Sequence, residues 1–342
     1  MWDMEKRSDY IGESSAFLDS VERASRAAAL NRPVLVIGER GTGKELVAER
    51  LHRLSPRWEG PLVTLNCAAL TETLIEAELF GHEAGAFTGA TRARAGRFEE
   101  ADGGTLFLDE LATLSAGAQE RLLRAVEYGE VTRIGANRPV TVDVRVVAAT
   151  NVHLPDLVRE GKFRADLLDR LAFEVVTLPP LREREDDISL LADHFGRRMA
   201  AELDWPRWPG FATETMAAIM AYNWPGNVRE LRNVVERAVY RWDYPDKPVG
   251  AIQFDPFASP WRPASVPAAP AAPVRDDVIT TKDLPAPRPP VNDLRIAVAA
   301  YEHDILCDTL AAHRHNQRAA AKALNLSYDQ LRHALKRHKI IA

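Results

Sequence analysis

The chain has 342 residues, of which 46% are hydrophobic, two cysteines and a formal net charge of −5. This length is typical of two or three domains, and the apolar content is ordinary for a globular protein. The apolar runs are too short to span a bilayer, and the first residues contain no apolar signal core. We therefore exclude membrane-spanning, secreted, collagenous and disulfide-rich proteins, and expect a cytoplasmic protein without direct membrane insertion.

Charge is distributed unevenly along the chain. Residues 313–342 hold four Arg and three Lys against one Asp, a net of +6, which leaves −11 for the other 312 residues. A basic end on an acidic body indicates nucleic-acid binding at that end only. We therefore expect the protein to associate with the nucleoid.

Before residue 185 the sequence alternates apolar strand segments with helical segments, which predicts an α/β fold with a parallel sheet covered on both faces. The expected strands are residues 34–37, 62–65, 105–108, 145–149 and 173–178, and the helices between them include residues 45–54, 116–127 and 154–160. After residue 185 the strands stop, and the sequence predicts a small helical subdomain with helices over residues 186–202, 213–222 and 228–242.

A proline-rich stretch follows this helical subdomain. Residues 255–292 contain ten of the 22 prolines, and proline neither propagates a helix nor donates to a β-ladder. We interpret the stretch as an extended tether, with an ordered surface loop as the alternative. Beyond it, residues 292–310 and 317–339 have helical patterns. The predicted domains are residues 9–180, residues 181–245, a linker over 246–291, and residues 292–342.

A glycine-rich segment follows the first expected strand and opens a helix. Residues 38–44, Gly-Glu-Arg-Gly-Thr-Gly-Lys, match the G-x-x-x-x-G-K pattern of phosphate-binding loops, whose N–H groups and lysine hold the phosphates of ATP. The next residue is Glu45, where such loops usually carry a Ser or Thr that binds Mg²⁺. The expected nucleotide-binding residues are Gly38, Glu39, Arg40, Gly41, Thr42, Gly43, Lys44 and Glu45.

A second motif, residues 103–110, is an apolar strand that ends in two carboxylates. We expect Asp109 to hold the Mg²⁺ ion and Glu110 to polarise the attacking water. An acidic strand end alone is more often a solvated turn. The presence of Lys44, 65 residues earlier, favours an ATPase that uses ATP and Mg²⁺.

Two asparagines follow or end expected strands. Asn151 is placed to sense the γ-phosphate or to position water. Asn66 is placed to hold Glu110 inactive until nucleotide and target are bound, provided that their strands are neighbours. Both are therefore candidate members of the catalytic site.

Two arginines, Arg164 and Arg170, lie six residues apart in a polar segment. We expect one or both to enter the site of a neighbouring subunit as arginine fingers, which stabilise the charge on the transferring phosphoryl group. Surface salt bridges with Asp166 and Asp169 are the alternative.

Residues 85–90, Gly-Ala-Phe-Thr-Gly-Ala, complete the set of motifs. Together with the phosphate loop, the strand that ends in Asp109, and residues 178–184 and 224–231, they resemble the bacterial enhancer-binding proteins, the AAA+ ATPases that activate sigma-54 RNA polymerase. The resemblance covers about residues 9–245 and the C-terminal helices. It implies an AAA+ P-loop NTPase with a helical lid, in which an exposed, flexible loop contacts sigma-54 through Gly85, Ala86, Phe87, Thr88, Gly89 and Ala90.

The resemblance further implies a homo-hexameric ring whose ATP hydrolysis moves this loop and remodels the sigma-54 RNA polymerase holoenzyme until the promoter opens. Arg229 matches the lid arginine that contacts nucleotide in this family, and Glu45 is the family's usual residue at its position. Arg182 and Arg184 are expected to be structural, at the junction between the two subdomains.

Residues 315–338 have the pattern of a helix–turn–helix and are similar to the Fis-type helices of the same family. Ser327 is expected to cap the second helix, Leu331 and Leu335 to face inward, and Cys307 to lie in the core. A solvated basic pair of helices is the alternative. The residues left to contact upstream enhancer DNA are Ser327, Tyr328, Gln330, Arg332, His333, Lys336 and Arg337.

The ATPase pattern begins near residue 9, so we expect control in trans or through expression level rather than by a sensory domain of the chain. This organisation, with residues 10–15, 55–61 and 163–173, is most similar to the branch of the family that activates the phage-shock operon and is restrained by the phage-shock A protein. Trp58 lies in a polar loop and is a candidate contact for that inhibitor. Packing of Trp58 within its own subunit is the alternative.

Three other functions fit parts of the sequence. A AAA+ motor on DNA needs no sigma-54, and residues 85–90 argue against it. A DNA-binding repressor with a degenerate ATPase is disfavoured by the intact Lys44, Asp109 and Glu110. The sequence scarcely distinguishes an activator of another sigma-54 operon, under a different inhibitor, from the phage-shock activator.

Overall fold

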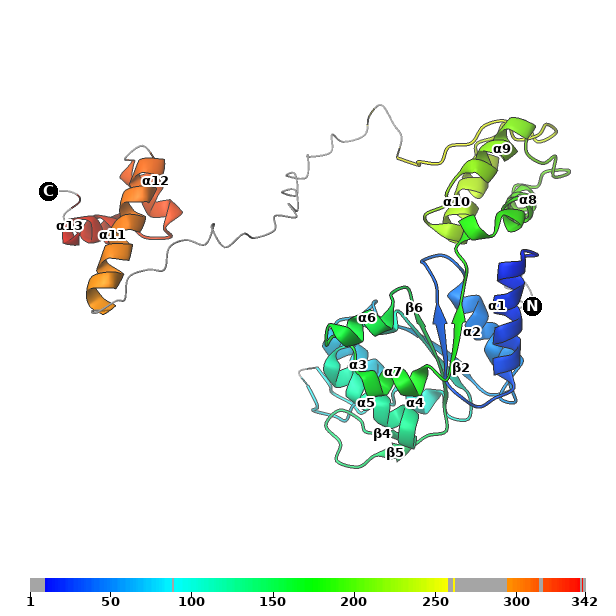
Figure 1. Ribbon diagram of the computed structural model, residues 1–342, viewed down its shortest axis with the longest axis horizontal. Helices are drawn as coiled ribbons and strands as arrows, with labels where there is room; N and C mark the ends of the chain where they lie inside the picture. Colours follow the sequence, from blue (N-terminus) through cyan, green and yellow to red (C-terminus); the bar gives the residue numbers. More distant parts are fainter. Residues whose placement is uncertain are drawn as a thin grey trace, which may run out of the picture. The chain divides into compact units, whose positions relative to one another are not determined.

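The computed structural model describes residues 10–87, 89–257, 261, 294–313, 316–338 and 340, and the chain divides into two compact units, Met1–Arg262 and Pro263–Ala342 (Figure 1). Most of the expected linker, residues 246–291, lies outside the described residues. Within the described ranges, no helix has the length and apolar content that a bilayer crossing requires.

The first unit is built on a five-stranded sheet in the order β2-β3-β6-β1-β7. All neighbouring strands are parallel, which confirms the expected doubly covered α/β sheet. Each strand ends within one or two residues of its predicted limit. The strands are β1 (Val34–Ile37), β2 (Leu62–Asn66), β3 (Thr105–Asp109), β6 (Arg145–Thr150) and β7 (Glu174–Thr177).

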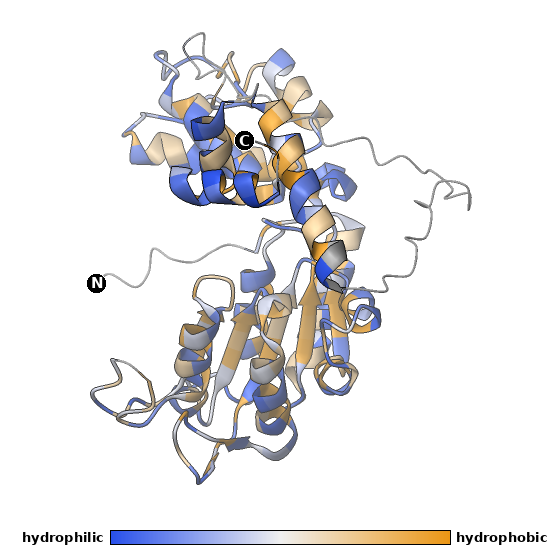
Figure 2. Ribbon diagram, turned by 90° about the vertical axis from the view of Figure 1, so that its left-hand side faces the viewer, coloured by the Kyte–Doolittle hydropathy of each residue, from blue (hydrophilic) through white to orange (hydrophobic). Residues whose placement is uncertain are grey.

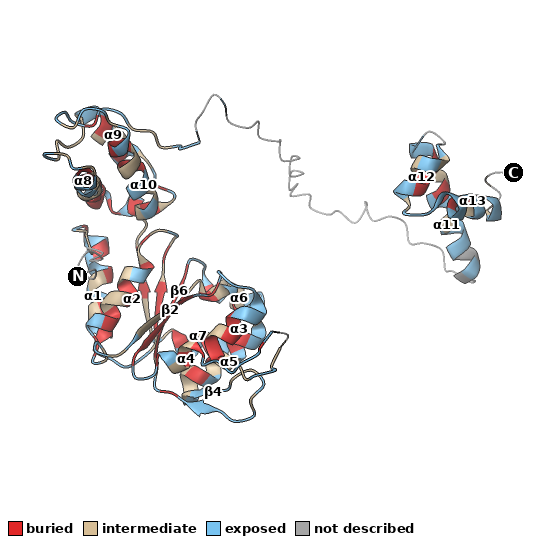
Figure 3. Ribbon diagram, turned by 180° about the vertical axis from the view of Figure 1, so that it is seen from behind, coloured by how far each residue is buried: buried red, intermediate tan, exposed pale blue. Residues whose placement is uncertain are grey.

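Side chains of the central strands alternate between two apolar cores, because successive residues of a strand point to opposite faces of the sheet. Val34 and Val36 pack against helices α1 (Ser15–Ala28) and α2 (Lys44–Arg53). Leu35 packs on the other face, where five helices supply the core. These are α3 (Glu72–Phe80), α4 (Arg97–Glu100), α5 (Ala116–Tyr128), α6 (Leu154–Arg159) and α7 (Ala165–Leu171). Figure 2 shows the central strands as largely apolar, and Figure 3 shows them as buried.

A short antiparallel hairpin, β4 (Glu130–Val131) and β5 (Val140–Thr141), follows α5 and was not predicted. Its connecting segment reaches the base of the loop that carries residues 85–90. His82 forms bridges with both Arg94 and Ile134, so the loop begins and ends at a fixed point of the fold. Arg133 pairs with Glu83 at 3.2 Å and with Glu99 at 2.7 Å and strengthens this attachment.

The lid consists of α8 (Glu185–Glu202), α9 (Thr213–Ala221) and α10 (Asn227–Tyr240), as expected, and follows a short 3-10 turn, η2 (Leu181–Glu183). Trp224 is fully buried in its core, and its indole N–H donates to the Ile219 carbonyl at 2.9 Å. Packing of the lid continues past residue 245. Val249 is fully buried and pairs with Phe211, and the Phe254 ring stacks on Tyr222 with 4.3 Å between centroids.

The lid is joined to α1 by a buried carboxylate. Asp187, in the first turn of α8, accepts hydrogen bonds from the N–H groups of Glu13 (2.6 Å) and Ser14 (2.9 Å), which precede α1. Arg184 donates to the same carboxylate at 2.7 Å. Gly12 is needed beside it, because a Cβ there would lie 2.3 Å from the Phe17 ring. The junction is therefore tightly packed, in agreement with the structural role expected for Arg184.

The second unit contains α11 (Leu294–Ala312), α12 (Gln317–Ala323) and α13 (Tyr328–Arg337), and the last two form the predicted helix–turn–helix. Ser327 caps α13 as expected, because its hydroxyl accepts from the Gln330 N–H at 3.2 Å. The expectation for Cys307 was wrong, since this residue is only partly buried. The core of this unit consists of Leu306, Leu310, Ala320, Ala321, Leu331 and Leu335.

Candidate active site

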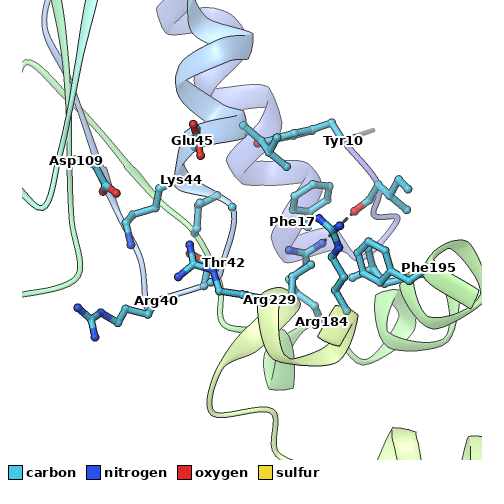
Figure 4. Close-up of a pocket in the computed structure, with 18 of the residues that line it drawn as sticks. Tyr10, Phe17, Arg40, Thr42, Lys44, Glu45, Asp109, Arg184, Phe195 and Arg229 are labelled. Atoms are coloured by element: carbon cyan, nitrogen blue, oxygen red, sulfur yellow. Dashed lines mark hydrogen bonds between the residues drawn. The ribbon is translucent and has the colours of Figure 1, made fainter. Parts of the chain in front are cut away.

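A cavity of about 590 Å³ lies between the α/β subdomain and the lid (Figure 4). Its size is typical of small-molecule sites. The phosphate loop (residues 38–44), the carboxyl end of β3 and the lid helices α8 and α10 contribute to its walls. The expected site residues that line it are Arg40, Gly41, Thr42, Gly43, Lys44, Glu45, Asn66, Asp109, Glu110 and Arg229.

The phosphate loop has the backbone that its glycines predict. Gly41 (φ 79°) and Gly43 (φ 99°) lie in the left-handed region, and α2 begins at Lys44. The Lys44 ammonium donates to the carbonyl oxygens of Gly38 at 2.9 Å and Glu39 at 3.2 Å. The loop therefore curls around the Lys44 side chain. The N-terminal end of α2, which follows the loop, faces the cavity.

Burial lowers the pKa of Lys44, and the nearby carboxylates of Asp109 and Glu110 act against this shift. These three groups approach one another because Asp109 is the last residue of β3 and the loop follows β1 at the same edge of the sheet. Figure 4 shows Asp109 and Lys44 on neighbouring segments. A cation and two carboxylates therefore converge on one wall of the cavity.

Glu110 has a backbone conformation that is unusual for its residue type. Its φ of 53° is left-handed, a region sparsely populated by residues other than glycine and often occupied at functional sites. Its N–H donates to Asp109 Oδ1 at 3.0 Å, and Arg40 Nε lies 3.8 Å from its Oε1. This turn directs the Glu110 carboxylate to the cavity instead of continuing the strand.

Asn66 lies next to the two carboxylates, as expected, because β2 pairs with β3 in a register that aligns Asn66 with Asp109. Its Oδ1 accepts from the Ala68 N–H at 2.9 Å, and among the described residues no hydrogen bond joins Asn66 to Glu110. Asn151 follows β6 and is exposed, and it is not among the described residues that line the cavity.

The two candidate arginine fingers lie away from the cavity of their own chain, Arg164 directly before α7 and Arg170 within it. Arg164 pairs with Asp166 through two hydrogen bonds of 3.0 and 2.7 Å, as the alternative interpretation expected. Arg170 pairs instead with Glu127 at 2.5 Å. Side chains of both arginines are about half exposed, so a neighbouring subunit has access to them.

Sequence reasoning missed one side of the cavity. Tyr10, Ile11 and Phe17 contribute from the start of the chain, and His194 and Phe195 contribute from α8. No local motif marks these residues, because the fold brings them together from about 180 positions apart. Burial raises the pKa of Tyr10 to about 12, and its buried hydroxyl has no hydrogen-bond partner among the described residues.

The loop of residues 85–90 is turned at two glycines, Gly85 (φ 81°) and Gly89 (φ 103°), and closed by a 2.7 Å bond from the Gly85 N–H to the Ala90 carbonyl. Phe87 is less exposed than expected. It is partly buried, with its ring centroid 5.0 Å from that of His82. Thr88 lies outside the described residues.

Trp58 is 61% exposed, as its polar loop predicts. The loop is held in place by Arg57, whose guanidinium donates to the Asp143 carbonyl at 2.7 Å and to its carboxylate at 2.6 Å. Leu54 beside it is 50% exposed. A fixed loop thus presents Trp58 to solvent.

On α13, the expected DNA contacts fall into two groups. Arg332, His333 and Lys336 are exposed and Tyr328 is 41% exposed. Arg337 pairs with Glu302 of α11, and the Gln330 side chain closes the cap by accepting from the Ser327 N–H at 2.8 Å. Both groups are exposed, and the members of the second group are in addition held by these contacts within the chain.

Comparison with families of known proteins matches three segments of the chain. The sigma-54 interaction domain matches residues 10–177, the AAA+ ATPase lid domain residues 182–248, and the Fis family of bacterial regulatory proteins residues 297–338. These segments correspond to the α/β subdomain, the lid and the helix–turn–helix described above.

Individual proteins are similar over different lengths. The chain is 51% identical over 336 residues to the Psp operon transcriptional activator of Escherichia coli K12, covering 98% of this chain and 99% of that protein. It is 52% identical over 229 residues to the transcriptional regulatory protein ZraR of Salmonella typhimurium, covering 67% of this chain and 52% of that protein. The crystal structure of NtrX from Brucella abortus in complex with ATP has a TM-score of 0.66 and 31% identity, over 96% of this chain and 69% of that chain.

Proposed function

Because this chain belongs to the family of sigma-54-dependent transcription activators, we propose that it activates the phage-shock operon and that the phage-shock A protein restrains it in trans. The chain combines the AAA+ ATPase that acts on sigma-54 with a DNA-binding helix–turn–helix. The observation that carries the operon assignment is the 51% identity to the Psp operon activator over nearly the full length of both chains.

In the proposed mechanism, water attacks the γ-phosphate of ATP in line with the bond that breaks. The phosphate loop holds the phosphates, and Lys44 neutralises the charge that develops on them. Glu110 polarises the attacking water, Asn66 holds Glu110 inactive until nucleotide and target are bound, and Asn151 senses the γ-phosphate or positions water. The convergence of Lys44 and Glu110 in one cavity supports these roles.

Asp109 is the proposed ligand of Mg²⁺. No three His, Cys, Asp or Glu side chains of the described part of the chain form a metal site by themselves. A nucleotide-bound Mg²⁺ commonly takes one or two carboxylates, with phosphates and water as its other ligands, so the Asp109–Glu110 pair fits it. When bound, the ion would neutralise charge on the β- and γ-phosphates.

The proposed assembly is a homo-hexameric ring. Arg164 and Arg170 act in it as fingers on the site of the next subunit, which their half-exposed position outside their own cavity supports. Arg229 couples the lid to the nucleotide, and residues 85–90 transmit the movement to sigma-54. Because both proposed partners, enhancer DNA and sigma-54 RNA polymerase, belong to the nucleoid, the proposed place of action is the cytoplasm.

Footprinting of the purified protein on genomic fragments tests the operon assignment. We expect protection upstream of the phage-shock operon, followed by melting of that promoter only when sigma-54 RNA polymerase and ATP are both present. Protection of a different sigma-54 promoter, with none at the phage-shock operon, would assign the activator to that operon instead.

A further inference from the structure

Asn227, the first residue of α10, connects the lid directly to the phosphate loop. Its side chain is fully buried. Oδ1 accepts from the Leu181 N–H at 2.7 Å, and Nδ2 donates to Glu39 Oε2 and to the Arg40 carbonyl, both at 3.0 Å. An amide has one acceptor oxygen and two N–H donors, so every polar group of this side chain is engaged.

The backbone of Asn227 is shaped to make these bonds. Its φ of 54° is left-handed, a conformation that asparagine adopts more readily than most residues. Its N–H donates to the Trp224 carbonyl at 2.8 Å, and Trp224 itself has a φ of 50°. Two left-handed residues in one short turn therefore direct the amide away from α10 and toward the loop.

Two further contacts lie beside this one. Arg182 donates to both carboxylate oxygens of Glu39, at 3.0 and 2.7 Å. Gly41 lies so close to the lid that a Cβ there would be 2.3 Å from the Gly226 carbonyl oxygen. Three consecutive residues of the loop, 39–41, thus contact the lid, and Asn227 makes the buried part of the contact.

Arg229, which lines the nucleotide cavity, is two residues after Asn227 in the same helical turn. Movement of this turn therefore displaces both the loop contact and the cavity arginine. A phosphate loop binds through N–H groups whose directions must be fixed in advance, and displacements of about 1 Å weaken such a site strongly.

We propose that Asn227 is a positioning residue for the phosphate loop. It sets the shape of residues 39–41 before nucleotide arrives, and it transmits the angle of the lid to the loop without passing through the nucleotide. The lid then acts on nucleotide affinity by two routes, one through Arg229 and one through Asn227.

The test variant is Asn227→Asp in the full chain. The substitution keeps an acceptor for the Leu181 N–H and the shape of the side chain, but it places a carboxylate oxygen against Glu39 and the Arg40 carbonyl. We expect binding of a fluorescent ADP analogue to weaken at least tenfold. The double variant Asn227→Asp/Glu39→Gln restores a donor–acceptor pair in the reverse direction, and it should recover at least threefold of that loss.

Glu230→Gln is the matched control. Glu230 lies in the same turn, but among the described residues its carboxylate accepts hydrogen bonds from lid groups alone, the Gly226 N–H at 2.7 Å and the Tyr222 hydroxyl at 3.4 Å. We expect nucleotide affinity within twofold of wild type. An equal loss in Glu230→Gln, or no recovery in the double variant, would overturn the proposal.

If Asn227→Asp fails to fold, Arg182→Gln tests the neighbouring contact between the lid and Glu39, where the Arg182 side chain is 44% exposed. Weakening of ADP binding by about threefold or more supports the proposal, and unchanged binding overturns it. Nucleotide binding requires neither DNA nor sigma-54, so either result is independent of the operon assignment.

Discussion

At the scale of single residues, Asp187 joins the lid to the segment before α1. Its carboxylate has no exposed surface and accepts from Glu13, Ser14 and Arg184. Burial raises the pKa of this carboxyl, but the hydrogen bonds outweigh burial and keep the pKa below its ordinary value of 3.8. The group is therefore ionised in the folded protein and fixes Ser14, the residue before α1, whose hydroxyl donates to Asp187 at 2.7 Å and makes no bond to its own helix.

We expect Asp187→Asn to lower the free energy of unfolding at pH 7 by about 3–5 kcal/mol, because it leaves Arg184 buried without its charged partner. Urea unfolding measures the change. The control is Glu22→Gln, which removes an exposed ion pair with Arg26 and should cost about 1 kcal/mol or less. Equal losses in the two variants would contradict the role of Asp187.

The contribution of the Asp187 carboxylate to stability depends on pH. Since its folded-state pKa is below its unfolded value of 3.8, its stabilisation is fully present above about pH 5 and is lost as the pH falls through the folded-state pKa. Below pH 5, the free energy of unfolding should therefore fall more steeply with decreasing pH in wild type than in Asp187→Asn, as urea unfolding at successive pH values measures.

At the scale of elements, the loops carry the specific functions and the sheet holds them in place. The loop of residues 85–90 starts from a fixed base at His82 and packs Phe87 against the same residue. The Trp58 loop, which precedes β2 in the sequence, is fixed by the bond of Arg57 to Asp143. Each loop can therefore be altered without altering the nucleotide cavity, to which neither contributes a lining residue among those described.

We expect Thr88→Ala to keep ATP hydrolysis within about twofold of wild type and to lose at least tenfold in open-complex formation, a loss of about 1.4 kcal/mol. The reason is that, in the proposed mechanism, the hydroxyl of Thr88 acts on sigma-54 and not on nucleotide. ATPase assays and promoter-melting assays on the same preparation measure the two activities. Thr213→Ala, the same change on the exposed start of α9, should alter neither. Normal promoter opening by Thr88→Ala would remove Thr88 from sigma-54 contact.

We expect Trp58→Ala to hydrolyse ATP normally but to escape inhibition by purified phage-shock A protein, since an exposed Trp at an interface contributes about 2 kcal/mol or more. Inhibitor titrations of the ATPase measure the effect. Tyr240→Ala removes an aromatic ring that is 68% exposed on the lid and should remain inhibited. Unaltered inhibition of Trp58→Ala would place the contact elsewhere.

Elements with a strong local signal were predicted from the sequence, and those without one were missed. The strands are continuous buried runs between turns, so their positions were predicted closely. Helix α3 has apolar residues on all sides, so its sequence shows no one-sided helical pattern. The phosphate loop and the Asp109–Glu110 pair are contiguous motifs. The Tyr10 and His194 side of the cavity depends on tertiary packing, so no local pattern predicts it.

At the scale of the whole molecule, the cavity of one chain contains Lys44, Asp109 and Glu110 but neither of the proposed arginine fingers. Arg164 and Arg170 are instead paired with Asp166 and Glu127 on their own surface. Each active site of the proposed ring is therefore shared between two chains, with Glu110 from one and a finger from the other. This arrangement is a heterologous contact that closes into a ring.

Two inactive variants should therefore restore activity to each other. Glu110→Gln should slow turnover by about 100-fold or more and Arg164→Ala by about 1,000-fold. Mixed in equal amounts, they should recover about one quarter of wild-type ATPase, because one interface in four then pairs an intact site with an intact finger. A mixture of Glu110→Gln with Lys44→Ala is the control, since both changes damage the same side of the interface. We expect no recovery of ATPase activity in this control mixture. No recovery in the mixture of Glu110→Gln with Arg164→Ala would contradict the proposal that the arginine finger acts on a neighbouring chain.

The contact between Asn227 and the phosphate loop also has a consequence for synthesis of the chain. Asn227 bonds to residues 187 and 188 positions earlier, so the loop leaves the ribosome long before the residue that shapes it. Domains fold as they emerge, from the N-terminus onward. During most of the translation of the ATPase, the phosphate loop of the nascent chain therefore lacks its bonds to Asn227. The site is completed only when the lid has been synthesised.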